Sequence, residues 1–306
     1  MDEPNMIDNP IPWPNGARCA ACLTFDMDAD SLIHLDHPAD GFKRVSPISM
    51  LRYGPTIAVP RIVKTYKQLG IRQTFFVPAW CIERYPAAIE AMVEGGNEIG
   101  HHGYLHENPC EGTAQEQGYW LDRGIDVIVR ATGKRPRGWR APLYNFSDCS
   151  IDLLLERGFQ YDASLMGHDI PYLIESRNGR GTLVELPSHW GLDDWPQYVH
   201  SIDLDYMMPV RAPLAGLRAF VEEFDACYKY GGLWVPVLHP FATGRLARWD
   251  ALAQFIEQLL ARGDVWFAPM EDISAYVAQL VASGKWTPMR ETLPQYDGPL
   301  GIARTA

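Results

Sequence analysis

Strand-like and helical stretches alternate along most of this chain, and that alternation constrains its fold more than any other feature of the sequence. Short apolar runs predict strands, and amphipathic stretches that end at glycine predict helices. Strands that alternate with helices are typical of a mainly parallel sheet. No Ser/Gly linker, internal repeat or low-complexity tract divides the 306 residues. We therefore expect one α/β domain over residues 1–306, folded as a barrel, with a tail at 287–306 that wraps the surface or a neighbouring subunit.

The expected elements can be given by residue range. Strands are expected at 17–25, 73–77, 97–100, 182–186, 234–238 and 265–268, with a short extended element at 138–139. Helices are expected at 60–69, 86–94, 113–130, 148–157, 214–228, 246–260 and 273–282. The helix at 113–130 opens with a capping box, in which Thr113 and Glu116 satisfy each other's backbone N–H groups.

Charge and hydropathy exclude several kinds of partner. There are 27 Lys and Arg residues against 38 Asp and Glu residues, for a formal net charge of −11. With no basic excess to neutralise phosphates, we expect neither a nucleic acid nor a membrane surface as partner. No apolar run approaches the roughly 18 residues needed to span a bilayer. Residues 1–16 lack the basic and apolar regions of a secretory signal, so we expect a cytoplasmic protein.

The six cysteines are scattered along the chain, which suits free thiols in a reducing compartment. Cys19 and Cys22 form a C-x-x-C pattern, but they fall within a predicted strand. Residues three apart on a strand point to opposite faces, so the two thiols are expected to be core residues rather than ligands of one ion.

Chemically active side chains follow the predicted strands, as ligand-binding residues do in parallel α/β folds. Asp26 and Asp28 come at the end of the first strand, and His102 and His106 follow the third. Arg140 follows the element at 138–139, and His239 follows the strand at 234–238. Because the carboxyl ends of parallel strands meet at one edge, we expect these side chains to share a site.

Two histidines in H-x-x-x-H spacing and a distant aspartate make the N,N,O ligand set of a catalytic zinc or similar divalent ion. Such an ion lowers the pKa of a bound water, and a carboxylate that does not bind the metal can then accept the proton. Asp26 and Asp28 are two apart and can face one site, one as base and one as ligand. Taken alone, the D-x-D pattern also fits a helix-capping turn, and the H-x-x-x-H pattern also fits a chance pair. His239 taken alone also fits a core histidine. Their joint placement at the ends of strands favours a shared metal site over these separate structural roles.

Five motifs occur in a fixed order: TFDMD at 24–28, HGYLH at 102–106, RAPLY at 140–144, LDDW at 192–195 and LHP at 238–240. Together they resemble the motifs of the polysaccharide deacetylase (NodB-homology, carbohydrate esterase 4) superfamily, over about residues 17–273. HGYLHENP at 102–109, YDASLM at 161–166 and VELP at 184–187 resemble the signal-less branch with the Helicobacter-type peptidoglycan deacetylase. Metal-independent allantoinases and cyclic-imide hydrolases are neighbours in that branch. The resemblance implies a distorted (β/α)7-like barrel and a homotetramer.

The resemblance also implies a role for each motif residue. Asp26 matches the catalytic base and Asp28 the aspartate ligand. His102 and His106 match the histidine ligands of one divalent metal per subunit, with Zn²⁺ as the first choice. All three ligands are present, which argues against the metal-free chemistry of the allantoinases. His101 falls in a variable position and is expected to be structural, because strand alternation points it away from His102.

The remaining matches surround this metal site. Arg140 matches the arginine that holds the base carboxylate ionised. The backbone N–H of Tyr144 matches the group that stabilises the oxyanion together with the metal. His239 matches the general acid, Asp194 (or Asp193) its acidic partner, and Trp195 a wall of the pocket. Trp80, Trp139 and Trp190 are expected to be packing residues, and His34, His37, His168 and His189 are left without a role.

These residues predict a metal-dependent hydrolase of non-peptide C–N bonds. The family default is N-deacetylation of an acetamido sugar or its polymer. The alternative, suggested by the missing signal, is hydrolysis of a small cyclic amide or imide with the same machinery. A third possibility is a non-catalytic binding module on the same barrel. The substrate is thus expected to be a glycan or small-molecule amide.

Overall fold

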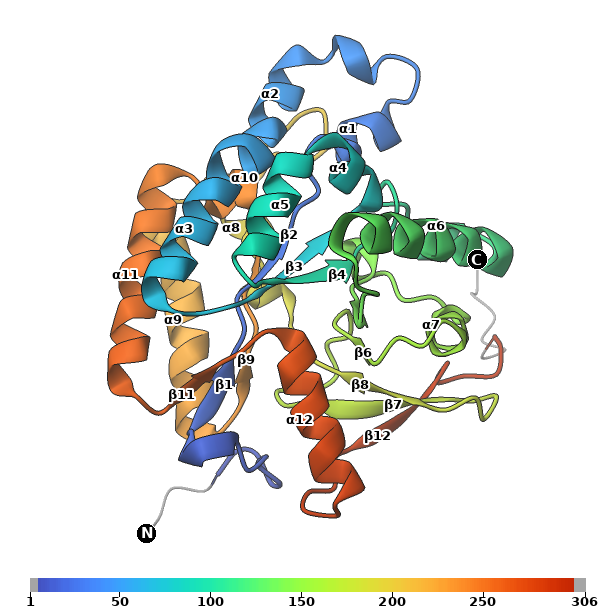
Figure 1. Cartoon of the computed structure of the whole chain (residues 1–306), viewed down its shortest axis with the longest axis vertical. Helices are drawn as coiled ribbons and strands as arrows, with labels where there is room; N and C mark the ends of the chain where they lie inside the picture. Colours follow the sequence, from blue (N-terminus) through green and yellow to red (C-terminus); the bar gives the residue numbers. More distant parts are fainter. Residues whose placement is uncertain (1–4, 300–306) are drawn as a thin grey trace, which may run out of the picture.

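The computed structural model describes residues 5–299 and has strands at its centre with helices packed around them (Figure 1). The strands are β1 Cys19–Ala21, β2 Thr24–Asp26, β3 Thr74–Val77, β4 Glu98–His101, β5 Gly138–Trp139, β6 Tyr161–Asp162, β7 Tyr172–Ser176, β8 Thr182–Glu185, β9 Leu233–Trp234, β10 Val237–Leu238, β11 Val265–Phe267 and β12 Arg290–Leu293. The α-helices are α1 Ser31–Asp36, α2 Val45–Tyr53, α3 Val59–Leu69, α4 Ala79–Arg84, α5 Pro86–Glu94, α6 Ala114–Thr132, α7 Ser150–Glu156, α8 Trp195–Tyr198, α9 Pro213–Tyr230, α10 Pro240–Thr243, α11 Leu246–Arg262 and α12 Met270–Ala282.

The larger sheet closes into the expected distorted barrel. Its strand order is β10-β2-β3-β4-β5-β6-β8-β7-β12, and every pairing is parallel except β7 with β8. A parallel bridge joins Asp193, which follows β8 in the chain, to Val237 on β10. Through this bridge the segment after β8 pairs with β10, the first strand of the order. The ring around the centre is therefore made of β2, β3, β4, β5, β6, β8 and β10. Strands β7 and β12 extend the sheet beyond the barrel, and β11-β1-β9 form a separate small sheet.

Two strands predicted as continuous are each divided in the structure. The stretch 17–25 becomes β1 and β2, and 234–238 becomes β9 and β10. The backbone N–H of Leu23, between β1 and β2, donates to the Gln73 side chain at 2.6 Å instead of to a strand. Pro236, between β9 and β10, has no N–H to donate. At these two points the chain passes from the small sheet into the barrel.

The helices confirm the sequence expectations more closely than the strands do. Thr113 and Glu116 form the capping box of α6, and α3 ends at Gly70, whose φ is +70°. In Figure 1, α3, α9 and α11 cover one side of the strands, while α6 and α7 lie on the other side. The region 31–53, to which the sequence assigned no helix or strand, contains α1 and α2.

The tail was predicted only in part. Residues 290–293 form β12, which pairs with β7 of the same chain, so this part of the tail completes a sheet rather than covering a neighbour. Residues 300–306 of the tail lie outside the described residues. All six cysteines are free, and Cys19 and Cys22 belong to two different core clusters, as expected for opposite faces of an extended segment.

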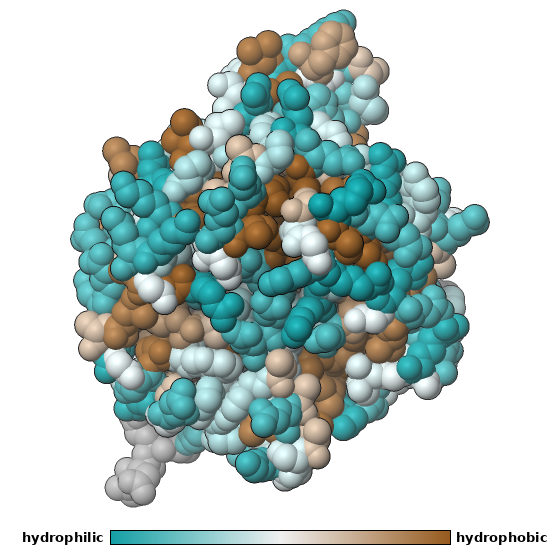
Figure 2. Space-filling view, in the orientation of Figure 1, coloured by the Kyte–Doolittle hydropathy of each residue, from teal (hydrophilic) through white to brown (hydrophobic). Residues whose placement is uncertain are grey.

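Within residues 5–299, no helix is both long and apolar enough to cross a bilayer. On the face shown in Figure 2, apolar side chains form separate patches between hydrophilic ones.

The parallel barrel places the motif residues at one end. Asp26 is the last residue of β2, and His101 is the last residue of β4, immediately before His102. Arg140 follows β5 directly, and His239 follows β10. Since β10, β2, β3, β4 and β5 run parallel and side by side, these residues meet where the strands end.

Candidate active site

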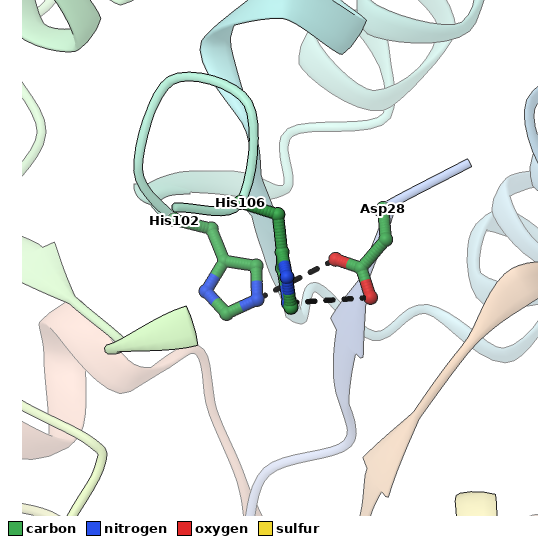
Figure 3. A group of neighbouring side chains, drawn as sticks. All are labelled: Asp28, His102 and His106. Carbon is green, nitrogen blue, oxygen red and sulfur yellow. Dashed lines mark ion pairs between the residues drawn. The ribbon is translucent and has the colours of Figure 1, made fainter. Parts of the chain in front are cut away.

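Asp28, His102 and His106 form a buried group of possible metal ligands (Figure 3). One ligand atom from each residue lies within 4.8 Å of the others. His102 Nε2 is 3.4 Å from Asp28 Oδ1, and His106 Nε2 is 3.8 Å from Asp28 Oδ2. The imidazoles come from the loop after β4, and the carboxylate from the segment after β2. The structure therefore brings together the three residues that the motifs predicted as ligands.

The hydrogen bonds and protonation of this group fit a divalent cation. His102 Nδ1 lies 2.8 Å from the backbone carbonyl of Arg140 and donates to it, which leaves Nε2 as an acceptor facing Asp28. Asp28 Oδ1 is buried without a hydrogen-bond partner. Burial lowers the pKa of His102, and it lowers the pKa of His106 to about 4, so both rings are neutral at pH 7. Two neutral imidazoles and one orphaned carboxylate oxygen form a set that a cation would satisfy.

The loop that carries His106 is held by a residue that the sequence interpretation did not use. His106 has a φ of +72° and Gly103 one of +74°, so the loop turns through left-handed conformations that cost energy at a non-glycine residue. The Glu107 carboxylate accepts the backbone N–H of Tyr104 at 2.8 Å and that of Leu105 at 2.7 Å. Glu107 follows His106 directly in the HGYLHENP motif, and an acid at that position was the available signal.

Replacing Glu107 with glutamine is expected to lower the affinity for a divalent metal by about 10- to 100-fold, the range typical of residues that orient metal ligands. A glutamine amide keeps one acceptor oxygen but puts an N–H group in place of the other, so one backbone N–H of the loop loses its acceptor and His106 is held less firmly. Competition of the purified protein with a chromogenic chelator measures the affinity. Glu111→Gln is the matched control, because the Glu111 carboxylate accepts from Asn108 instead. Equal affinities for wild type and Glu107→Gln would contradict the assignment.

Asp26 lies beside the metal-ligand group and pairs with Arg140. Arg140 Nη1 donates to Asp26 Oδ1 at 2.7 Å and to Thr24 Oγ1 at 2.9 Å. Burial alone would raise the pKa of Asp26, but the charge of Arg140 and its hydrogen bond lower it below its usual value. Asp26 Oδ2 is 3.8 Å from His102 Nε2, so one carboxylate oxygen binds the arginine and the other faces the ligands.

His239 is fixed by the Asp194 carboxylate. Nδ1 of His239 lies 2.7 Å from Asp194 Oδ1, and its backbone N–H donates to Oδ2 at 2.9 Å. Burial would lower the pKa of His239, but Asp194 raises it to about 10. Nε2 faces Asp28 Oδ2 at 3.5 Å. Of the two adjacent acids, Asp194 therefore contacts the histidine, whereas Asp193 accepts from the Tyr144 hydroxyl at 2.5 Å and from the backbone N–H of Trp195 at 2.7 Å.

The turn that follows Arg140 differs from the expectation for Tyr144. The backbone N–H of Tyr144, expected to face an oxyanion, donates to the Ala141 carbonyl at 3.0 Å within the short turn η5 Pro142–Tyr144. This N–H is engaged in the chain's own turn, because Leu143 and Tyr144 adopt φ values of +58° and +57° and fold it back. The hydroxyl of Tyr144, rather than its N–H, reaches into the site through Asp193.

A cavity of about 920 Å³ opens over these groups. Trp195 lines it as expected, and its ring lies edge-on to His239 with centroids 5.0 Å apart. Trp190 and Trp139, expected to be packing residues, also line the cavity, and Trp190 is half exposed. Trp190 lies two residues before the LDDW motif, a position that could have indicated this role.

The other histidines are placed away from this chemistry. His34, His37, His168 and His189 are absent from the residues that line the cavity. His101 points away from His102, with Nε2 3.2 Å from the Leu121 carbonyl on α6, as its expected structural role requires.

Comparison with known proteins shows which family this chain resembles. Residues 51–161 match the polysaccharide deacetylase family. A peptidoglycan deacetylase of Helicobacter pylori is 35% identical over 247 residues, which cover 73% of this chain and 84% of that protein. This chain belongs to the polysaccharide deacetylase family. A peptidoglycan deacetylase-like protein of Gibberella zeae, FGM2, is 34% identical over 45% of this chain and 48% of its own length.

Solved structures resemble this chain in fold as well as in sequence. The crystal structure of a Mycobacterium smegmatis protein assigned to the polysaccharide deacetylases superposes with a TM-score of 0.87 at 37% identity, over 94% of this chain and 98% of that one. Puue allantoinase shares the fold, with a TM-score of 0.76 at 24% identity over 92% and 96% of the two chains. As a member of this family, the chain is a polysaccharide deacetylase-like hydrolase that acts on amide bonds. The comparisons favour this activity over hydrolysis of a small cyclic amide.

Proposed function

We propose that this protein removes N-acetyl groups from an acetamido sugar or its polymer. One observation carries the proposal: the possible metal ligands, an arginine-paired carboxylate and an aspartate-paired histidine form a single buried group. His239 Nε2 lies 3.5 Å from Asp28, and His102 Nε2 lies 3.8 Å from Asp26. The activity named for the Helicobacter pylori relative supports a glycan as the substrate.

Asp28, His102 and His106 would hold one divalent metal. Zinc is the first choice, because two imidazoles and a carboxylate with an open position are a common catalytic zinc set. Bound there, the metal supplies polarisation of the amide carbonyl and a lower pKa for the attacking water.

Two ionisable residues each carry out one proton transfer of the reaction. Arg140 keeps Asp26 as a carboxylate, so Asp26 can accept the proton of the attacking water. His239 carries a proton stabilised by Asp194 and can donate from Nε2 to the leaving nitrogen. The amide C–N bond breaks, one water is consumed, and acetate and the free amine are released. The edge-on contact with His239 supports Trp195 as the pocket wall beside the leaving group.

A substrate panel tests this proposal. The metal-loaded protein is assayed for acetate release from N-acetylated chitooligosaccharides and for ring opening of succinimide, hydantoin and a dihydropyrimidine. We expect acetate release from the chitooligosaccharides, because the cavity is far larger than an acetamido group. Turnover of the cyclic compounds alone would replace the deacetylase proposal with the cyclic amide alternative.

The chain is further proposed to act as one catalytic domain, because β1 near its start pairs with β9 and β11 from its last third. The homotetramer and the cytoplasmic location expected from the sequence stay predictions.

A further inference from the structure

The cavity over the site has an acidic wall. Among the described residues that line it, the carboxylates are Asp26, Asp28, Asp36, Glu107, Glu111, Glu116 and Asp193. No lysine or arginine is among the described lining residues. Arg140 is fully buried behind Asp26 and is bound to it, so its charge is compensated there.

The wall carboxylates bind uncharged donors. Glu111 accepts from the Asn108 amide at 2.9 Å, and Glu116 accepts from the Thr113 N–H and hydroxyl at 2.8 Å. Asp193 accepts from the Tyr144 hydroxyl at 2.5 Å. Hydrogen bonds from neutral groups orient a carboxylate but leave its charge in place. The negative charge of Glu111 and Glu116 therefore acts on whatever enters the cavity.

The rest of the wall is neutral and suits a sugar. Trp120, Trp190, Trp195 and Tyr206 line the cavity, and aromatic faces pack against the C–H faces of pyranose rings. Trp139 also lines it while only 3% exposed, and its indole N–H has no hydrogen-bond partner among the described residues. This buried N–H is a donor left for a hydroxyl or carbonyl oxygen of a ligand, since buried polar groups are normally paired.

We propose that this cavity selects N-acetylated amino sugars whose other substituents are neutral or cationic, and disfavours those that carry a carboxylate. The inference rests on the proposed deacetylase function and specifies its substrate class. Carboxylates on the wall accept hydrogen bonds from sugar hydroxyls and attract ammonium groups of residues already deacetylated. A substrate carboxylate meets the like charge of Glu111 and Glu116, and apart from the protonated His239 and the metal of the catalytic group it finds no cation among the described lining residues.

A matched pair of ligands tests the selection. The disaccharide of N-acetylglucosamine and N-acetylmuramic acid is prepared with its lactyl group as the free acid and as the methyl ester. Their dissociation constants are measured by calorimetry on metal-loaded Asp26→Asn/Arg140→Met protein, which lacks the catalytic base and leaves no uncompensated arginine charge beside the cavity. We expect the ester to bind about 10-fold more tightly at low salt, the effect of one like charge within about 7 Å at an intermediate dielectric. The difference should shrink as salt rises.

Charge variants in the same background locate the effect. Glu111→Lys is expected to bring the acid-to-ester ratio close to one, because it places a cation on the wall. Glu94→Lys makes the same charge change at an exposed position of α5 outside the cavity and is expected to leave the ratio unchanged.

Each outcome decides the inference. Equal binding of acid and ester, tighter binding of the acid, no binding of either, or no response to Glu111→Lys would overturn it. Acetate release from neutral chitotetraose by the wild-type protein is measured separately. Failure of that assay refutes the proposed deacetylation, while the binding ratio still reports on the charge preference of the cavity.

Discussion

Replacing Asp26 with asparagine is expected to lower turnover of the best acetamido substrate by about 10²- to 10⁴-fold, the usual contribution of a general base. The asparagine amide has nearly the shape of the carboxylate but cannot accept a proton from the attacking water. Metal binding should persist, because Asp28, His102 and His106 are unchanged. Steady-state rates and the metal content per subunit measure the two effects.

The variant also removes the partner of a buried charge, so stability needs its own control. Arg140 is fully buried and pairs with Asp26 at 2.7 Å, and breaking such a pair costs about 3–5 kcal/mol of stability. The double variant Asp26→Asn/Arg140→Met removes both charges and is expected to regain part of the unfolding free energy in urea, without regaining activity. Asp250→Asn, at an exposed position of α11, controls for the substitution itself. Wild-type turnover by the folded Asp26→Asn protein would contradict the assignment of the base.

Removing the metal is expected to abolish turnover, and adding a divalent ion is expected to restore it. Replacing His106 with alanine should weaken metal binding by more than about 100-fold, because loss of groups that merely orient ligands already costs 10- to 100-fold. The remaining Asp28 and His102 give two ligands instead of three. Dialysis against a chelator, back-titration with Zn²⁺, Co²⁺ or Mn²⁺, and competition with a chromogenic chelator measure activity and affinity.

His168→Gln is the matched control for the metal experiment, because His168 does not line the cavity. It should keep the affinity of the wild type. Full activity in a protein shown by elemental analysis to be free of metal would rule out this use of the three residues. Unchanged affinity in His106→Ala would show that other groups hold the ion.

The fold was predicted well where local sequence and tertiary structure agree. The capping box at Thr113 and the glycine stop at Gly70 act within one helical turn, so α6 and the end of α3 follow from sequence alone. The division of residues 17–25 into β1 and β2 was not predictable, because it depends on the Gln73 side chain replacing a strand partner of Leu23. The β12 strand also depends on its partner, since 290–293 is too polar to be read as a strand without β7 beside it.

At the active site, too, some features follow from the sequence and others depend on tertiary contacts. The order of the motifs placed Asp28, His102 and His106 at strand ends, and the parallel barrel brings these strand ends together. Two contacts depend on the fold of loops: the N–H of Tyr144 turns back to Ala141, and the Glu107 carboxylate closes the His106 loop. Backbone turns with positive φ outside glycine leave no pattern in a single sequence, so neither contact was predicted.

The sequence by itself determined the fold class, the family and the residue types available for chemistry, because hydrophobic periodicity and motif order are local properties that survive without coordinates. Only the tertiary structure decided which group each residue contacts. Asp193 and Asp194 are neighbours in the chain, yet one binds Tyr144 and the other binds His239, because the chain is extended at Asp193 and turns at Asp194 into the start of α8. The acidic wall of the cavity, with no lysine or arginine among its described residues, is likewise a tertiary property, since its carboxylates come from separate strands, helices and loops that meet only when the barrel closes.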